Sequence, residues 1–198
     1  MKSGTRALGI AESYREERSH LAGVVVTPDR TVDGVSLSSC TVGGTDSTAG
    51  VVDCYRRLDR DDIRYVFVSG IALAWYNVFD LSAAAKAIDR PVLSVTFESS
   101  EGLERSLREH FTGGDLDERL AIYEALSPRE RIDVNGHDVY VRSAGLSDGT
   151  GPSAATIVRA FTPEGGRPEP VRVSRLVARA VADDREDDPP TTPDPERS

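Results

Sequence analysis

The pattern of hydrophobic and polar positions predicts three strands followed by alternating helices and strands. Five short apolar runs have the length of buried strands: 6–11, 21–27, 31–42, 64–68 and 91–97. The run 64–68 shows no polar alternation after Arg64, which is typical of a central strand covered on both faces. Turn residues at 28–30 predict that the second and third strands form a hairpin.

Capping residues and apolar spacing predict the helices. Gly43-Gly44 and the N-cap residues after them begin a helix that ends near Arg60. Asp80 or Ser82 caps the next helix, which runs through Ile88. Further helices are expected from Ser99 or Ser100 to Phe111, and over 115–126, 153–161 and 170–182. Asn135-Gly136, between apolar runs, predicts a tight hairpin within 131–142.

This element order is characteristic of ribonuclease H-like α/β domains. We therefore expect a mixed five-stranded sheet with helices on both faces, followed by a C-terminal hairpin and further helices. A single domain should span residues 1–182. Residues 183–198 are acidic, rich in proline and without large apolar groups, so they should form a disordered tail.

The charge balance is unusual. The formal net charge is -9, and Lys2 and Lys86 are the only lysines among 24 basic residues. Acid excess with little lysine suggests adaptation to molar salt and a halophilic archaeal source; an ordinary acidic, arginine-rich protein from a GC-rich genome is the alternative. Because concentrated salt already weakens phosphate contacts, the net charge does not exclude a nucleic-acid partner.

The sequence also predicts the setting of the protein. No apolar run approaches the roughly 18 residues that a membrane span needs, and the N-terminus lacks the apolar core of a signal peptide. We expect a cytoplasmic protein without membrane partners. The two cysteines, Cys40 and Cys54, should then be reduced, buried thiols.

Several motifs resemble an uncharacterised archaeal family of endonuclease V homologues (domain of unknown function, family 99), in a haloarchaeal form. They are RALGIAES, VGGTDSTAGVV, FVSGIALAWYNVFD, RPVLSV and RPEPVRVSRLVARAV, in this order between about residues 4 and 182. The resemblance implies the endonuclease V-like, ribonuclease H-like fold that the element order predicts. It also implies descent from magnesium-dependent enzymes that cut DNA or RNA near deaminated adenine.

The family that this chain resembles has an acidic residue at two positions where this chain has none. The family pattern resembles Gly-Ile-Asp-Asp-Ser on the first strand and Asp-Gly-Ile after the fourth. Ala11 and Ser69 stand at the first acidic position of each pattern. Because successive strand side chains point to opposite faces, Glu12 does not replace an acid at position 11 unless a bulge redirects it.

Three carboxylates remain as catalytic candidates: Glu12, Asp46 and Asp80. If the protein is active, they would work with Mg²⁺, which takes oxygen ligands, and Glu12 and Asp46 are the candidate metal ligands. Each also has a structural interpretation. Glu12 can be a solvated strand-end acid, Asp46 an acid at a helix start, and Asp80 the cap of the helix over 81–88.

Candidate contacts to DNA or RNA lie in two segments. Trp75, Tyr76 and Asn77 are the candidates in the matched segment. The two aromatic rings can stack on an unpaired base or simply cover the end of the sheet. Arg172, Arg175 and Arg179 form one stripe on the last helix. That stripe can contact phosphates, or it can be a solvated face that pairs with acids.

Three functions are consistent with these residues. The one we favour is an endonuclease V-like nucleic-acid-binding protein whose metal site is degenerate and whose nuclease activity is weak or lost. The second is an active Mg²⁺-dependent endonuclease that uses a rearranged carboxylate site. The third is a non-catalytic protein-interaction scaffold, without any cofactor.

Overall fold

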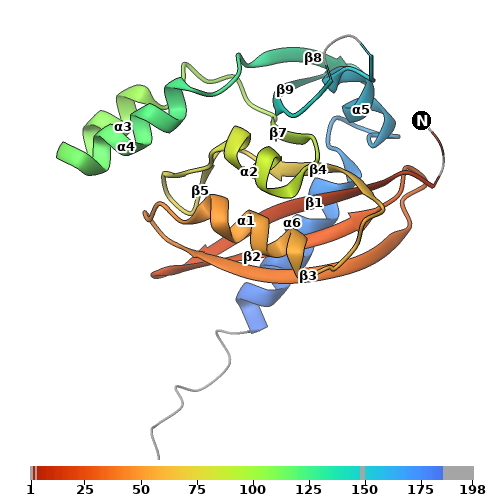
Figure 1. Ribbon diagram of the computed structural model, residues 1–198, viewed down its shortest axis with the longest axis horizontal. Coiled ribbons are helices and arrows are strands. Elements are labelled where there is room, and N and C mark those ends of the chain that lie inside the picture. Colours follow the sequence, from red (N-terminus) through yellow and green to blue (C-terminus); the bar gives the residue numbers. More distant parts are fainter. Residues whose placement is uncertain (1, 3, 148–149, 185–198) are drawn as a thin grey trace, which may run out of the picture.

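Seven strands form one mixed sheet in the computed structural model, which describes residues 2, 4–147 and 150–184 (Figure 1). The order across the sheet is β3-β2-β1-β4-β7-β9-β8, and a separate pair, β5 and β6, follows β4 along the chain. The strands are β1 (Arg6–Arg15), β2 (Arg18–Val26), β3 (Val32–Thr41), β4 (Ile63–Ser69), β5 (Ala72–Leu73), β6 (Asn77–Val78), β7 (Val92–Thr96), β8 (Glu130–Val134) and β9 (His137–Ala144).

The strand pairing follows the predicted order and extends it. β1, β2 and β3 form an antiparallel meander, which contains the predicted hairpin of the second and third strands. β1, β4 and β7 lie parallel. The hairpin of β8 and β9 does not stand apart. β9 pairs antiparallel with the free edge of β7, with Val95 opposite Val141, so the sheet has seven strands where five were expected.

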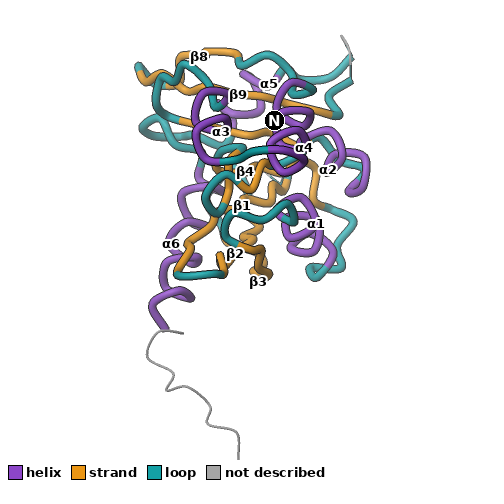
Figure 2. Tube along the Cα trace, turned by 90° about the vertical axis from the view of Figure 1, so that its left-hand side faces the viewer, coloured by secondary structure: helices purple, strands orange, loops and turns teal. Residues whose placement is uncertain are grey.

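Helices cover both faces of the sheet (Figure 2). α1 and α2 pack on one face of the sheet and share a hydrophobic core with it, and we call this the α1 face. α5 and α6 share a second core with the opposite face, which we call the α6 face. The helices are α1 (Ser47–Arg56), α2 (Leu81–Ile88), α3 (Glu104–His110), α4 (Gly113–Glu124), α5 (Ala154–Ala160) and α6 (Glu169–Asp184).

Alternation along β1 sorts its side chains between the two faces. Leu8 and Ile10 lie in the core on the α1 face, whereas Ala7 lies in the core on the α6 face. Gly9 also faces α6, and a Cβ atom there would sit 2.1 Å from the carbonyl carbon of Pro170. Glycine at this position therefore lets the start of α6 lie directly on the sheet.

α3 and α4 form a lobe beside the sheet, around a small core that contains Leu107, Leu120 and Val78 (Figure 1). α3 begins at Glu104, several residues after the predicted caps Ser99 and Ser100. Gly102 explains the late start, because its φ of 114° lies outside the helical region.

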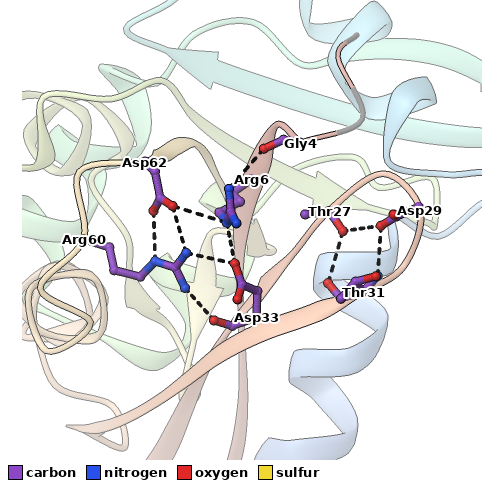
Figure 3. Close-up of polar contacts among 8 residues, drawn as sticks. All are labelled: Gly4, Arg6, Thr27, Asp29, Thr31, Asp33, Arg60 and Asp62. Carbon is purple, nitrogen blue, oxygen red and sulfur yellow. Dashed lines mark hydrogen bonds and ion pairs between the residues drawn. The ribbon is translucent and has the colours of Figure 1, made fainter.

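A network of two arginines and two aspartates ties the start of β1 to the start of β3 and to the loop before β4 (Figure 3). Arg6 binds Asp33, and Arg60 binds both Asp33 and Asp62, each at 2.8 Å. Hydrogen bonds from the two guanidinium groups hold the pKa of Asp33 below its ordinary value. Each charge in this network has an opposite partner, so it is a structural clamp at the edge of the sheet where β1 begins.

The last helix extends slightly beyond its predicted end. α6 continues to Asp184, so the first two residues of the expected tail, Asp183 and Asp184, are helical. Residues 185–198, the rest of that expected tail, lie outside the described residues. Within the described part of the chain, no helix has both the length and the apolar character that a membrane crossing requires.

Candidate nucleic-acid site at the ends of the parallel strands

The two positions without an acid lie side by side. β1 and β4 run parallel with Gly9 beside Phe67 and Ile10 beside Val68, so Ala11 comes beside Ser69. By strand alternation both side chains face α6, since Ala7 and Phe67 belong to the core on that face. Ala11 is buried, and Ser69 is half-buried. Where two neighbouring carboxylates were expected, the chain thus offers one hydroxyl group.

Glu12 lies on the opposite face from Ala11. The pairing of β1 with β2 runs without a register shift from Ala7 to Arg15, so no bulge redirects the side chain. The carboxylate of Glu12 instead accepts a hydrogen bond of 2.5 Å from the hydroxyl of Ser19, on the facing strand. Glu12 therefore does not compensate for the missing acid at position 11.

Asp46 and Asn77 form a polar clasp between the start of α1 and β6. Asn77 is fully buried, and its Nδ2 donates to Asp46 Oδ1 at 2.7 Å and to the carbonyl oxygen of Thr41 at 2.9 Å. Asn77 Oδ1 accepts from the backbone amide of Ser47 at 2.9 Å. Asp46 also accepts from the amide and the hydroxyl of Thr41. These contacts satisfy both side chains within the protein.

The clasp stabilises the ionised form of Asp46. Burial raises the pKa of this carboxyl, but the hydrogen bonds from Thr41 and Asn77 outweigh burial and bring the pKa below its ordinary value. Burial also raises the pKa of the Cys40 thiol to about 12, and the charges of Asp46 and Glu12 add to that effect. Cys40 and Cys54 are free, buried thiols, as predicted.

Asp80 caps α2. Its side chain accepts a hydrogen bond of 2.9 Å from the backbone amide of Ala83, and its own amide donates to the hydroxyl of Thr48 in α1. This is the geometry of an N-cap residue. The structural interpretation of Asp80 therefore accounts for its contacts.

The residues present do not fit a magnesium site. A structural or catalytic divalent ion needs several oxygen ligands directed at one point. Across residues 2, 4–147 and 150–184, no three His, Cys, Asp or Glu side chains are grouped so that they could hold a metal ion. Glu12, Asp46 and Asp80 are each engaged with different protein partners.

Trp75 and Tyr76 lie in a turn of unusual conformation between β5 and β6. Ala74, Trp75 and Tyr76 have φ values of 44°, 55° and 60°, which is costly for residues with a side chain. Trp75 is 44% exposed, and the centre of its ring lies 5.5 Å from that of His110 and 5.6 Å from that of Phe111. An exposed aromatic surface thus projects beside the ends of the parallel strands.

Arg119, in α4, holds this turn against the start of α1, and no motif in the sequence indicated its role. It is buried, and it donates to the carbonyl oxygens of Tyr76 at 3.2 Å and of Gly44 at 3.0 Å. Its guanidinium carbon lies 4.0 Å from the centre of the Phe111 ring. One side chain from the α3–α4 lobe therefore fixes two loops of the candidate site.

A cavity of about 360 Å³ opens where β4 and β7 end. It lies on the α1 face, since Ser94 and Thr96 line it while Val95 belongs to the core of the other face. Arg129 crosses one wall, donating to the hydroxyl of Thr96 at 2.6 Å, with its guanidinium carbon 4.1 Å from the centre of the Tyr140 ring. The lining residues are Gly70, Ile71, Ala72, Ser94, Thr96, Ser100, Glu101, Gly102, Leu103, Tyr123, Arg129, Tyr140 and Arg142.

The predicted arginine stripe on α6 divides into two parts. Arg172 binds Glu169 through two hydrogen bonds of 2.6 and 2.7 Å. The side chains of Arg175 and Arg179 make no hydrogen bond or ion pair with any other described residue. Together with Arg167, Arg172 and Leu176 they line a groove of about 440 Å³.

A family model described as Endonuclease dU matches residues 3–182, nearly the whole described chain. The chain belongs to the Endonuclease dU family. Among its relatives, a UPF0215 protein of Pyrobaculum calidifontis is 34% identical over 88% of this chain and 95% of its own length. A UPF0215 protein of Thermococcus gammatolerans is 33% identical over 83% of this chain and 82% of its own length.

Solved structures confirm the fold of this member of the Endonuclease dU family. A protein of unknown function from Archaeoglobus fulgidus aligns with a TM-score of 0.78 and 28% identity, over 89% of this chain and 97% of its own. Endonuclease V of Bacillus subtilis aligns with a TM-score of 0.60 and 12% identity, over 92% and 82%. The mixed α/β fold is therefore endonuclease V-like, as the element order and the resemblance predicted.

One further neighbour was crystallised with nucleic acid. Endonuclease V of Ciona intestinalis, in complex with a 24mer DNA containing an inosine followed by a ribo-adenosine, aligns with a TM-score of 0.58 and 12% identity. The alignment covers 91% of this chain and 87% of that one. At this level of identity the likeness establishes the shared fold.

Proposed function

We propose that this protein binds DNA or RNA and that its metal-dependent cleavage is weak or lost. The observation that carries the proposal is the pair Ala11 and Ser69, which lie beside each other on one face of two parallel strands. A methyl group and a hydroxyl group cannot offset the charge of Mg²⁺. The family name and the DNA complex of the Ciona neighbour support a nucleic-acid ligand.

The cavity and the exposed aromatic turn suit an unpaired base. The cavity volume of about 360 Å³ is within the range of small-ligand pockets, and Tyr123, Tyr140 and the Gly70–Ala72 segment line it. Trp75 and Tyr76 give an aromatic surface on which a base can stack. Asn77 contributes indirectly in this proposal, because it holds the turn that carries the two rings.

The proposal separates binding from cleavage, so both must be measured on the same probes. Fluorescein-labelled single strands of DNA and RNA, with and without one deoxyuridine or inosine, are incubated with the purified protein over a range of KCl concentrations. Anisotropy reports binding, and denaturing gels with Mg²⁺ or Mn²⁺ report cleavage. We expect saturable binding with little or no strand cleavage.

Two results would replace the proposal by an alternative. Rapid metal-dependent cleavage that is abolished by Asp46→Asn would assign an active site built from Glu12, Asp46 and Asp80. Absence of binding to every probe, together with a stable protein partner in a pull-down, would assign a protein-interaction scaffold. In both tests Arg57→Gln serves as a control, since Arg57 is exposed on the end of α1.

A further inference from the structure

The groove lined by Arg167, Arg172, Arg175, Leu176 and Arg179, which we call the arginine groove, concentrates positive charge on an acidic protein. Four of its five lining residues are arginines, and none is an acid. Glu169 neutralises Arg172 alone. In the clamp of Figure 3, by contrast, Arg6 and Arg60 both bind aspartates. Positive charge in the groove is thus left without a counter-charge among the described residues.

Arg167 is half-buried and lies over an aromatic ring. Its guanidinium carbon lies 4.3 Å from the centre of the Phe97 ring. Burial lowers the pKa of Arg167, and repulsion from Arg175 and Arg179 lowers it further. The positive charges of these arginines repel one another, and an anion bound between them would remove that repulsion.

The groove lies on the face from which the carboxylates are missing. Ser69 pairs with Val95 of β7, and Phe97 follows two residues later on the same face. A strand spacing of about 4.8 Å and a rise of about 3.3 Å per residue place the Cα atoms of Ser69 and Phe97 roughly 8 Å apart. Arg167, over the Phe97 ring, therefore lies on the same face of the sheet as the Ala11–Ser69 pair.

We propose that the arginine groove binds the sugar–phosphate backbone of a nucleic-acid strand, with Arg167, Arg175 and Arg179 as direct phosphate contacts. This inference rests on the proposed function and adds the path of the strand. Guanidinium groups donate two parallel hydrogen bonds to one phosphate and stay charged at any working pH. A row of them follows a backbone without reading its bases, so the contacts would be independent of sequence.

The test measures how binding depends on salt. For a single strand, each phosphate contact made by an arginine adds about 0.7 to the steepness with which log K falls as log[salt] rises. With a fluorescein-labelled 20-nucleotide DNA strand as probe, the variant Arg175→Gln/Arg179→Gln should reduce this slope by about 1.4 and weaken binding about 25-fold at 0.1 M KCl. The variant Arg175→Lys/Arg179→Lys should keep the slope, because it keeps both charges.

The matched control removes the same charge elsewhere. Arg56→Gln/Arg57→Gln changes two exposed arginines at the end of α1, on the other face of the sheet. It should leave the slope unchanged. If both glutamine variants lose the same amount of salt-dependence slope, binding depends on net charge alone, and the proposed role of the arginine groove is wrong. Circular dichroism of each variant confirms that it is folded at every salt concentration used.

The remaining outcomes separate this inference from the proposed function. If the wild-type chain binds the strand and the groove variant keeps its full slope, the groove is wrong while nucleic-acid binding stands. If the wild-type chain binds no strand, both fail. Competition by polyglutamate as effective per charge as by DNA would overturn the groove in favour of an acidic peptide. If inorganic phosphate competes as well as DNA at an equal concentration of phosphate groups, the groove is an isolated anion site and does not bind a strand.

Discussion

Replacing Asn77 by alanine should strongly destabilise the fold. Asn77 is fully buried and makes three hydrogen bonds, to Asp46, Thr41 and Ser47. The variant leaves the amide of Ser47 and the carbonyl oxygen of Thr41 without this partner, and it removes a hydrogen bond to a charged carboxylate. Each such loss costs about 1–3 kcal/mol, and a sum of about 4 kcal/mol allows for relaxation.

That loss is large against the usual net stability of about 5–15 kcal/mol. For a chain of this size about 3 °C is lost per kcal/mol, so the melting temperature should fall by about 12 °C. Urea unfolding followed by circular dichroism gives the free energy directly. A second asparagine, Asn135, provides the control, because its Nδ2 also donates to two carbonyl oxygens, those of Thr162 and Gly165, but from an exposed position.

The control variant is Asn135→Gly, since the φ of 54° at this residue would strain an alanine. It should cost about 1 kcal/mol or less, because water replaces its hydrogen bonds. An Asn77→Ala variant as stable as the control would refute the clasp. If it also lost nucleic-acid binding, Asn77 would be a contact residue, as its place in the matched segment first suggested.

Three further predictions concern the loops around the candidate site. Because hydrogen bonds lower the pKa of Asp46 in the folded state, its contribution is complete above the unfolded pKa of about 3.9 and is lost as the pH falls through the lower folded value; acid unfolding should therefore be less steep in Asp46→Asn. Asp80→Ala removes only a helix cap and should cost about 1 kcal/mol in urea unfolding, with binding to DNA unchanged; a loss of binding would restore Asp80 to the site. Arg119→Met removes the donors to the carbonyl oxygens of Tyr76 and Gly44 and should speed amide exchange in both loops; unchanged exchange would contradict its positioning role.

The sequence predicted those elements whose signals are local. The strands over 21–27 and 64–68 and the cap at Asp80 depend on runs, periods and neighbours within a few residues, and the structure has them close to the expected bounds. The hairpin at Asn135-Gly136 was also predicted, but the strand with which the hairpin pairs was not. Which free strand edge a hairpin joins depends on β7, some 40 residues away, and no local pattern encodes that choice.

The candidate site was only partly predictable, because its residues meet through the tertiary structure. The absence of acids at Ala11 and Ser69 could be seen by comparison with a family pattern, whereas their adjacency follows from the register of two strands. Asp46 and Asn77 were both singled out from the sequence, but 31 positions separate them and a single sequence cannot show that they bind each other. The cavity draws its lining from several separate segments, so no motif could indicate it.

Restoring the missing carboxylates should weaken the binding of a nucleic-acid strand as long as no metal is present. Ala11 and Ser69 lie on the face of the arginine groove, so Ala11→Asp/Ser69→Asp would add negative charges on the same face as Arg167. At 0.1 M salt the Debye length is about 10 Å, so charges on this face still act on one another. These charges would offset the field of the unpaired arginines and repel phosphates. With EDTA, the affinity for a labelled DNA strand should fall below that of Ser82→Asp/Ala87→Asp, which adds the same charge on exposed positions of α2.

Addition of Mn²⁺ should then reverse the effect in the Ala11→Asp/Ser69→Asp variant alone, because a divalent ion between the two new carboxylates returns positive charge to that face. Its melting temperature should rise with Mn²⁺ as well, since an ion that binds only the folded state stabilises it. Equal affinities of the two variants with EDTA would show that the missing acids and the arginine groove do not interact. Reversal by Mn²⁺ would therefore show that the charge at positions 11 and 69 and the charge of the arginine groove act on the same bound strand.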